Sequence, residues 1–246
     1  MAVRNIKLTV QYDGSKYHGW QIQPGKKTIQ GELVEAVSNL VGTKIHVHGA
    51  SRTDAGVSAL GQIALFEVDS PIPTENFPEA ISDRLPRDII VTSAEEVPWG
   101  FDLISGVTSK QYRYTIYTGR HRPVLQLNQC WHISKRLDAA AMNQAAQLLV
   151  GKKDFKSFAS AADKRQSSIR TIFRCEATSE DKWIYIDVEG DGFLYNMVRN
   201  IVGTLVEVGA GRWEPEKINE ILEAKDRTAA GPIAPPQGLC LMWIKY

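Results

Sequence analysis

Hydrophobic and polar residues form two kinds of pattern along the first hundred positions. Between positions 6 and 12 they alternate, which predicts a half-buried strand. After Thr28, a typical N-cap residue, apolar residues recur at helical spacing up to Val41 and predict a helix. Further strands are expected at 45–47, 63–68 and 89–91, with a helix at 77–85 that Pro86 ends. The resulting order is β-α-β-loop-β-α-β.

Similar patterns follow in the second half of the chain. Alternation predicts a strand at 112–116, and an alanine-rich segment predicts a helix over 137–150. Gly151 is expected to end that helix in the left-handed conformation. An apolar stripe over 194–208 predicts a longer helix closed by Gly209. The remaining expected elements are strands at 172–177, 183–188 and 239–244 and a short helix at 216–224.

Two halves of this kind indicate an α+β protein. We expect two ferredoxin-like (RRM-like) domains, each with an antiparallel sheet flanked by helices. The boundary is expected near residues 100–109. The N-terminal domain would then span 1–104 and the C-terminal domain 105–246.

Composition restricts the class of protein further. The 246 residues include 29 basic and 28 acidic ones, for a net charge of +1, and 43% are hydrophobic, which excludes disorder. The longest uncharged stretch, 228–244, contains three prolines and predicts no membrane span, and the N-terminus lacks the apolar region of a secretory signal. Three distant cysteines fit neither a disulfide framework nor a zinc site. We therefore expect a cytoplasmic protein without a built-in metal.

The near-zero net charge conceals segregation along the chain. Residues 110–122 contain four basic residues and no acid, and residues 151–175 have a net charge of +5, whereas residues 67–102 have −7. Aromatic residues are interleaved with the basic ones, a combination typical of surfaces that bind phosphates and stack bases. Solvated surface charge is the alternative interpretation.

Few residues suggest chemistry by themselves. Asp54 lies in the loop Arg52-Thr53-Asp54-Ala55-Gly56 between two expected strands and could enter a cleft, although Asp-Ala-Gly also favours a simple turn. His46 and His48 share a strand face, but only Asp54 could join them as a metal ligand. Tyr112 and Tyr114 could stack on bases or belong to the core, and Arg199 could lie on the surface or pair with a buried carboxylate.

Seven motifs, in order from the N-terminal strand to the C-terminus, resemble those of the tRNA pseudouridine synthase A (TruA) family. They are YDGSKYHGW at 12–20, RTDAGV at 52–57, KQYRY at 110–114, DFKSF at 154–158, MVRNIVG at 197–203, KDRTAA at 225–230 and APPQGL at 234–239. Three positions depart from the family pattern. Ser51 replaces a glycine, Ser58 replaces a histidine, and Asp102-Leu103-Ile104 replaces His-Ala-Arg, which removes a basic residue from a segment expected to touch RNA.

The resemblance implies isomerisation of uridine to pseudouridine at positions 38, 39 and 40 of the tRNA anticodon stem-loop, without cofactor or metal. Asp54 would be the catalytic carboxylate, as nucleophile or base, in a cleft between the domains. Arg199 would favour its ionised form, and Tyr112 would lie against the target uracil. Arg52 would fill the gap left by the flipped nucleotide.

The resemblance also implies partners, and two other functions remain open. tRNA would be held by the basic stretches, with Lys110, Arg113, Lys152, Lys153 and Lys156 as its contacts, and the chain would form a homodimer. The first alternative is a non-catalytic RNA-binding α+β protein. The second is a metal-dependent phosphoesterase that uses His46, His48 and Asp54.

Overall fold

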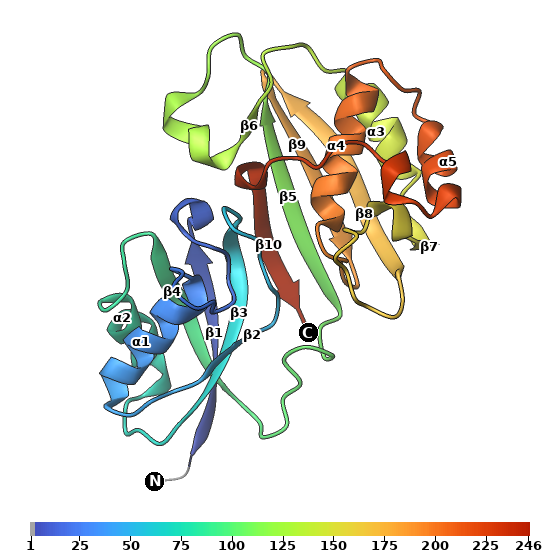
Figure 1. The fold of residues 1–246 in the computed structure, drawn as a ribbon. Helices are drawn as coiled ribbons and strands as arrows, with labels where there is room; N and C mark the ends of the chain where they lie inside the picture. The colour runs from blue at the N-terminus through green and yellow to red at the C-terminus, as the bar shows by residue number, and fades with distance from the viewer. Residues whose placement is uncertain (1–2) are drawn as a thin grey trace. The chain divides into compact units, whose positions relative to one another are not determined.

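The computed structural model describes residues 3–246 and confirms an α+β fold. The chain divides into two compact units, which are described separately (Figure 1). The first unit contains Met1–Thr108 and Cys240–Tyr246, and the second contains Ser109–Leu239. Residues 240–246, which we expected in the C-terminal domain, thus belong to the first unit. Their strand pairs with a strand of that unit, a long-range contact that local patterns do not reveal.

The first unit has the ferredoxin-like order of elements. Its helices are α1 (Ile29–Val41) and α2 (Phe77–Ser82), and its strands are β1 (Arg4–Tyr12), β2 (Val47–Gly49), β3 (Ser58–Val68), β4 (Ile89–Val97) and β10 (Leu239–Lys245). The sheet order β4-β1-β3-β2 matches that fold. Strand β10 runs parallel to β3 at Ser58 and Ala59, whereas β2 pairs with the other end of β3, antiparallel, at 64–66.

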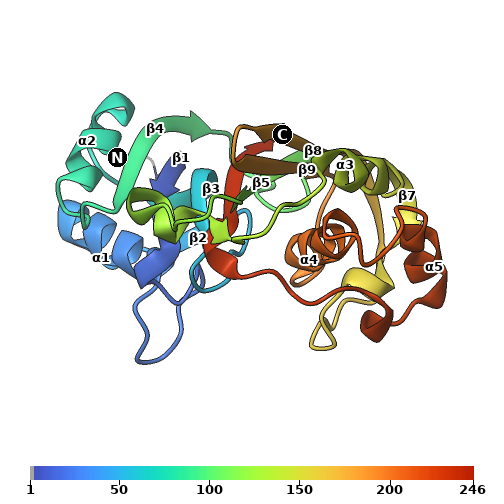
Figure 2. The same cartoon turned by 90° about the horizontal axis from the view of Figure 1, so that it is seen from above.

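The core of the first unit follows from the two hydrophobic patterns. Residues Ile6, Leu8 and Val10 of β1 are buried, as the alternation predicted. The Thr28 hydroxyl accepts a hydrogen bond from the backbone N–H of Gly31 and caps α1. Helices α1 and α2 lie side by side and cover one face of the sheet (Figures 1 and 2).

The second unit also combines a sheet with helices. Its strands are β5 (Ser109–Tyr117), β6 (Trp131–His132), β7 (Gly151–Asp154), β8 (Ile169–Glu180) and β9 (Trp183–Gly190), and its helices are α3 (Ala139–Gln147), α4 (Met197–Gly209) and α5 (Lys217–Ala224). The sheet order is β5-β9-β8-β7, antiparallel throughout, and β6 adds a short parallel pair to β5. Helix α3 packs on β8 and against α4 (Figure 2).

Three expectations need correction, two of them for the second unit alone. The helix expected over 137–150 is shorter, because Asp138 caps it by accepting hydrogen bonds from the backbone of Ala140 and Ala141, and residues after Gln147 form a turn. Gly151 has a positive φ of 105°, but it opens strand β7 rather than capping the helix. The sheets are also not wholly antiparallel, since each unit contains one parallel pair.

Candidate functional site

The loop that carries Asp54 joins β2 to β3 and is held by the segment 13–20. The backbone N–H of Trp20 donates to the carbonyl of Thr53 at 3.1 Å, and the N–H of Gly56 donates to the carbonyl of Tyr17 at 3.2 Å. These two bonds lie on either side of Asp54, so they fix the loop backbone at both of its flanks. The YDGSKYHGW motif therefore supports the loop that contains the candidate carboxylate.

Two glycines of this motif permit the close approach. A Cβ atom at Gly14 would lie 1.9 Å from the carbonyl oxygen of Val57, and one at Gly19 would lie 2.4 Å from that of Thr53. Gly19 also has a positive φ of 84°. The N–H of Gly14 donates to the Ser58 hydroxyl at 3.1 Å, so the serine at this departure from the family pattern has a structural contact.

A buried polar network lies beneath the same loop. Gln62, which is fully buried at the start of the apolar part of β3, donates through Nε2 to the carbonyl of Ser51 at 2.8 Å. The hydroxyls of Tyr12 and Thr53 are hydrogen-bonded at 2.8 Å. Sequence reasoning missed both contacts. The available signal was a glutamine beside the apolar run 63–68, where a buried amide needs partners.

These contacts leave the polar side chains of the loop differently exposed. Thr53 is buried, Asp54 is half-buried and Arg52 is exposed. A backbone hydrogen bond from Val57 to the carbonyl of Asp54 closes the turn at 3.1 Å. A half-buried carboxylate on a fixed backbone is suited to act as a nucleophile or general base, because its position does not have to be ordered during reaction.

In the second unit, the two tyrosines of β5 have different environments. Tyr114 is fully buried, and its hydroxyl donates to the carbonyl of Pro235 at 2.8 Å. Burial raises the pKa of Tyr114, and the charge of Arg199 acts in the opposite direction. Tyr112 is buried with its ring edge-to-face against Phe193, at 5.3 Å between centroids. Tyr114 is thus a core residue, and Tyr112 is the candidate for contact with a base.

Arg199 lies in the first turn of α4 and is half-buried. Its Nε donates to the carbonyl of Ala234 at 2.8 Å, and its Nη1 donates to Oδ1 of Asn196 at 3.3 Å. These contacts hold the guanidinium group in place, whereas the side chain of a surface arginine would extend into solvent. The backbone N–H of Ala234 in turn donates to the carbonyl of Arg199, at 3.1 Å.

Several motifs of the second unit meet at α4. A Cβ atom at Gly203 would lie 1.6 Å from the carbonyl oxygen of Pro232, so only glycine permits this contact. Asn200 is buried, donates to the carbonyl of Phe158 at 2.8 Å and accepts from Arg227 at 3.0 Å. The segments 154–158, 197–203 and 225–239 are therefore joined by packing and hydrogen bonds.

The basic residues expected to contact RNA differ in their surroundings. Lys152 and Lys156 are exposed, and Lys153 is half-buried on the edge strand β7. Burial, together with the charge of Arg165, lowers the pKa of Lys110 to about 8. Arg113 forms two hydrogen bonds of 2.9 Å with the buried carboxylate of Asp187, which gives it a structural role within the sheet.

The departure at 102–104 forms a compact turn. The carboxylate of Asp102 accepts hydrogen bonds from the backbone of Ile104 and Ser105, which lower the pKa of Asp102. The hydroxyl of Tyr246 donates to the carbonyl of Leu103 at 2.9 Å. In this chain, the segment is thus tied to the C-terminus of the first unit.

Residues 3–246 contain no cluster of metal ligands, no disulfide and no helix that could span a membrane. That range contains no cluster of three His, Cys, Asp or Glu side chains placed to hold a metal ion, and His46 and His48 are both exposed. The three cysteines form no disulfide there. No helix in the same range has the length and apolar character that a membrane span requires.

Comparison with known proteins gives matches along most of the chain. The model of a family described as tRNA pseudouridine synthase matches residues 8–103 and 145–246. A tRNA pseudouridine synthase A of Caldicellulosiruptor saccharolyticus is 43% identical over 244 residues, which cover 99% of this chain and 100% of that protein. A protein of the same name from Ruminiclostridium cellulolyticum is 44% identical over 245 residues, with the same coverage.

One solved structure with some similarity is a crystal structure of a Cbf5-Nop10-Gar1 complex. It is 12% identical with a TM-score of 0.34, and the match covers 81% of this chain and 54% of that one. A similarity this low supports no conclusion.

Replacement of Tyr12 by phenylalanine tests whether the buried network holds the loop. The change removes the hydrogen bond between the Tyr12 and Thr53 hydroxyls and the longer one, of 3.5 Å, that the Tyr12 hydroxyl accepts from Gln62. It leaves the buried Thr53 hydroxyl without that partner, at a cost of about 1–3 kcal/mol. We expect faster amide hydrogen exchange over residues 51–57, measured by mass spectrometry. Tyr195→Phe is the control, because Tyr195 is 45% exposed and lies in the other unit. Equal exchange over 51–57 in wild type and Tyr12→Phe would show that the buried network does not hold the loop.

Proposed function

The chain belongs to the tRNA pseudouridine synthase family and converts uridine to pseudouridine in tRNA, and we propose that Asp54 is its essential carboxylate. We further propose that the target uridines are those at positions 38, 39 and 40 of the anticodon stem-loop. The observation that carries the role of Asp54 is its place on a loop whose backbone is hydrogen-bonded on both flanks. A surface turn with no catalytic role would not need hydrogen bonds that fix its backbone in this way.

The reaction is an isomerisation and needs no outside group. The bond between N1 of uracil and C1′ of the ribose breaks, the base turns, and a bond forms between C5 and C1′. The hydrogen on C5 is released as a proton, and N1 gains a proton, so atoms and electrons balance without a redox partner. Asp54 acts as nucleophile or as base toward the ribose, and both routes require its ionised form.

We propose that three arginine and tyrosine side chains assist Asp54 on the same uridine. The guanidinium group of Arg199, held by Ala234 and Asn196, supplies a cation that favours an ionised carboxylate. The buried ring of Tyr112 stacks on the uracil. The exposed side chain of Arg52 fills the gap in the stem after the nucleotide flips, which offsets part of a cost of a few kcal/mol.

The basic residues of β7 and the turn after it are the proposed contacts for the tRNA backbone. Lys152 and Lys156 are exposed and Lys153 is half-buried, so their ammonium groups are available to phosphates. Phosphate contacts orient an A-form stem without reading its sequence, which suits an enzyme that acts at neighbouring positions. Lys110 is a further candidate, and so is Arg113, whose guanidinium group also pairs with the buried carboxylate of Asp187.

A non-catalytic RNA-binding protein on the same scaffold is the competing function. A carboxylate among groups that bind phosphate repels RNA and is unfavourable unless it takes part in a reaction. The relatives that match this chain over their full length are named synthases, which also favours catalysis. Activity is the property that separates the two functions.

The substitution Asp54→Asn tests the assigned role directly. We expect loss of turnover by at least about 10³-fold, because removal of the carboxylate eliminates its base or nucleophile function. The measurement is tritium release from tRNA transcribed with 5-tritiated uridine, with Asp54→Ala beside it and tRNA affinity as a control for folding. Substantial residual release would refute the role of Asp54. Absence of release from wild type, with tRNA still bound, would instead favour the non-catalytic alternative.

Neutralisation of Lys152, Lys153 and Lys156 to glutamine tests the proposed RNA surface. Removal of one lysine–phosphate interaction reduces the slope of log K against log salt by about 0.7–0.9, so removal of three reduces it by roughly 2–3 and weakens binding. Filter binding at several salt concentrations measures this change. A matched control neutralises three exposed lysines elsewhere, Lys26, Lys44 and Lys182. An unchanged slope in the variant without Lys152, Lys153 and Lys156 would show that these lysines face solvent in the complex with tRNA.

We also propose that the chain forms a homodimer and acts in the cytoplasm, where its tRNA substrate is found. Support for the dimer comes from the segment Val124–Gln129, in which Val124 and Leu125 are apolar and 73% and 89% exposed. Sedimentation at micromolar concentration should give a mass of twice 27.4 kDa, and Leu125→Glu should shift it toward the monomer. A wild-type protein that sediments only as a monomer would contradict the proposal.

A further inference from the structure

The segment between β9 and α4 contacts both candidate residues of the second unit. The ring of Phe193 packs edge-to-face on Tyr112, with an interplanar angle of 86°. Oδ1 of Asn196 accepts the hydrogen bond from Arg199, and Asn196 has a positive φ of 62° at the N-cap of α4. The position of this segment therefore affects the orientation of Tyr112 and of Arg199 together.

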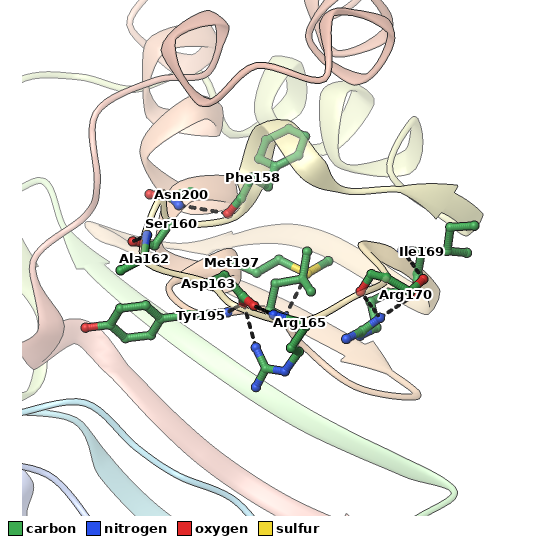
Figure 3. Close-up of polar contacts among 12 residues, drawn as sticks. Phe158, Ser160, Ala162, Asp163, Arg165, Ile169, Arg170, Tyr195, Met197 and Asn200 are labelled. Atoms are coloured by element: carbon green, nitrogen blue, oxygen red, sulfur yellow. Dashed lines mark hydrogen bonds and ion pairs between the residues drawn. The ribbon is translucent and has the colours of Figure 1, made fainter.

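The same segment is held by the chain that follows DFKSF, residues 160–170, which include the first two residues of β8 and are here called the latch loop. Oδ2 of Asp163 accepts the backbone N–H of Tyr195 at 2.6 Å, and the N–H of Ser160 donates to the carbonyl of Tyr195 at 2.9 Å. Both backbone groups of one residue are thus bonded to the latch loop. Figure 3 shows Asp163 between Tyr195 and Arg165, with the Tyr195 ring directed away from the loop.

Asp163 also organises the latch loop itself. Its carboxylate accepts the backbone N–H of Arg165 at 2.9 Å and the Nη1 of the same side chain at 2.6 Å. Burial by itself raises the pKa of Asp163, but these hydrogen bonds, the bond from Tyr195 and the charge of Arg165 together lower it. The carboxylate is therefore ionised at neutral pH. Its side chain is 6% exposed, whereas that of Arg165 is 51% exposed.

The outward side of the latch loop is basic. Lys164 and Arg165 are exposed, and Arg170 donates to the carbonyls of Ser167 and Ile169 within the loop. Arg165 also lies near enough to Lys110 for its charge to lower the pKa of that amine, after burial as the larger cause. Asp163 balances part of this charge, and the exposed side chains of Lys164 and Arg165 favour contact with a polyanion such as the tRNA backbone.

We propose that the latch loop contacts the tRNA backbone and that Asp163 is a positioning residue that ties this contact to the orientation of Tyr112 and Arg199. The link runs from Arg165 through the Asp163 carboxylate to the backbone of Tyr195, and from there to Phe193 and Asn196. It lies wholly within the second unit. The inference rests on the proposed function, because the bound polyanion is the tRNA substrate.

The substitution Asp163→Asn separates positioning from binding. The amide has no negative charge and one acceptor oxygen in place of two, so at least one of the three bonds to Tyr195 and Arg165 is lost and the remaining ones are weakened. We expect the single-turnover rate constant at saturating tRNA to fall about tenfold or more, the effect of a small misplacement of reacting groups. The tRNA affinity should stay the same or increase, because the Arg165 guanidinium is no longer paired with a negative charge.

Controls and the second variant make the outcome decisive. Asp181→Asn makes the same chemical change in an exposed turn with a positive φ that asparagine tolerates, and it should alter neither quantity. Arg165→Gln should weaken tRNA binding several-fold and reduce the salt slope by about one. A rate constant for Asp163→Asn equal to that of wild type, or a parallel loss of rate and affinity, would overturn the positioning role. An unchanged affinity and slope for Arg165→Gln would overturn the RNA contact.

The same assays keep this inference distinct from the proposed function. Tritium release by the wild-type enzyme establishes the reaction independently of either variant. If wild type releases no tritium, the proposed function fails. If wild type is active while Asp163→Asn is fully active as well, only the positioning role of Asp163 fails.

Discussion

The close contact between two backbone segments in the first unit is the constraint on which the candidate site depends. The segment 13–20 approaches the Asp54 loop so closely that there is no room for a side chain at position 14 or 19, where the chain has Gly14 and Gly19. Backbone hydrogen bonds, rather than side chains alone, then determine where the loop lies. A catalytic carboxylate gains from this arrangement, since the order that it needs is already provided by folding. The buried Gln62 and the hydroxyl of Tyr12 satisfy the polar groups that such a tight contact would otherwise leave unpaired.

In the second unit, a helix and the segment packed against it hold the candidate arginine in place. Helix α4 carries Arg199 in its first turn, and Gly203 allows the segment before β10 to pass against it. That segment supplies the carbonyl of Ala234 to the guanidinium group. Buried Asn200 joins the same helix to the carbonyl of Phe158 and to Arg227. The carbonyl of Ala234 and the side chain of Asn196 thus help to fix the orientation of the charged group.

The sequence predicted the elements where local pattern and local structure agree, and failed where long-range contacts decide. The alternation in β1 and the cap at Thr28 are local, and both were correct. The helix expected over 137–150 is longer than the observed one. Leu148 and Leu149 continue the apolar pattern but lie in a turn. The pairing of Arg113 with Asp187 was not predicted, because the two residues are 74 positions apart. Gln62 gave too weak a signal, since nothing local shows that its amide bonds to Ser51.

The division between fixed and exposed groups has a physical basis in the reaction itself. Flipping a uridine from a stem costs a few kcal/mol, which contacts to the RNA backbone can offset. Lysines on an edge strand suit that task, because phosphate contacts tolerate small differences between stems. Breaking and remaking a bond at C1′ tolerates far less displacement, so the groups that act there need rigid support. In the proposal made above, the Asp163 carboxylate, which binds both an exposed arginine and the backbone of Tyr195, connects the two kinds of surface.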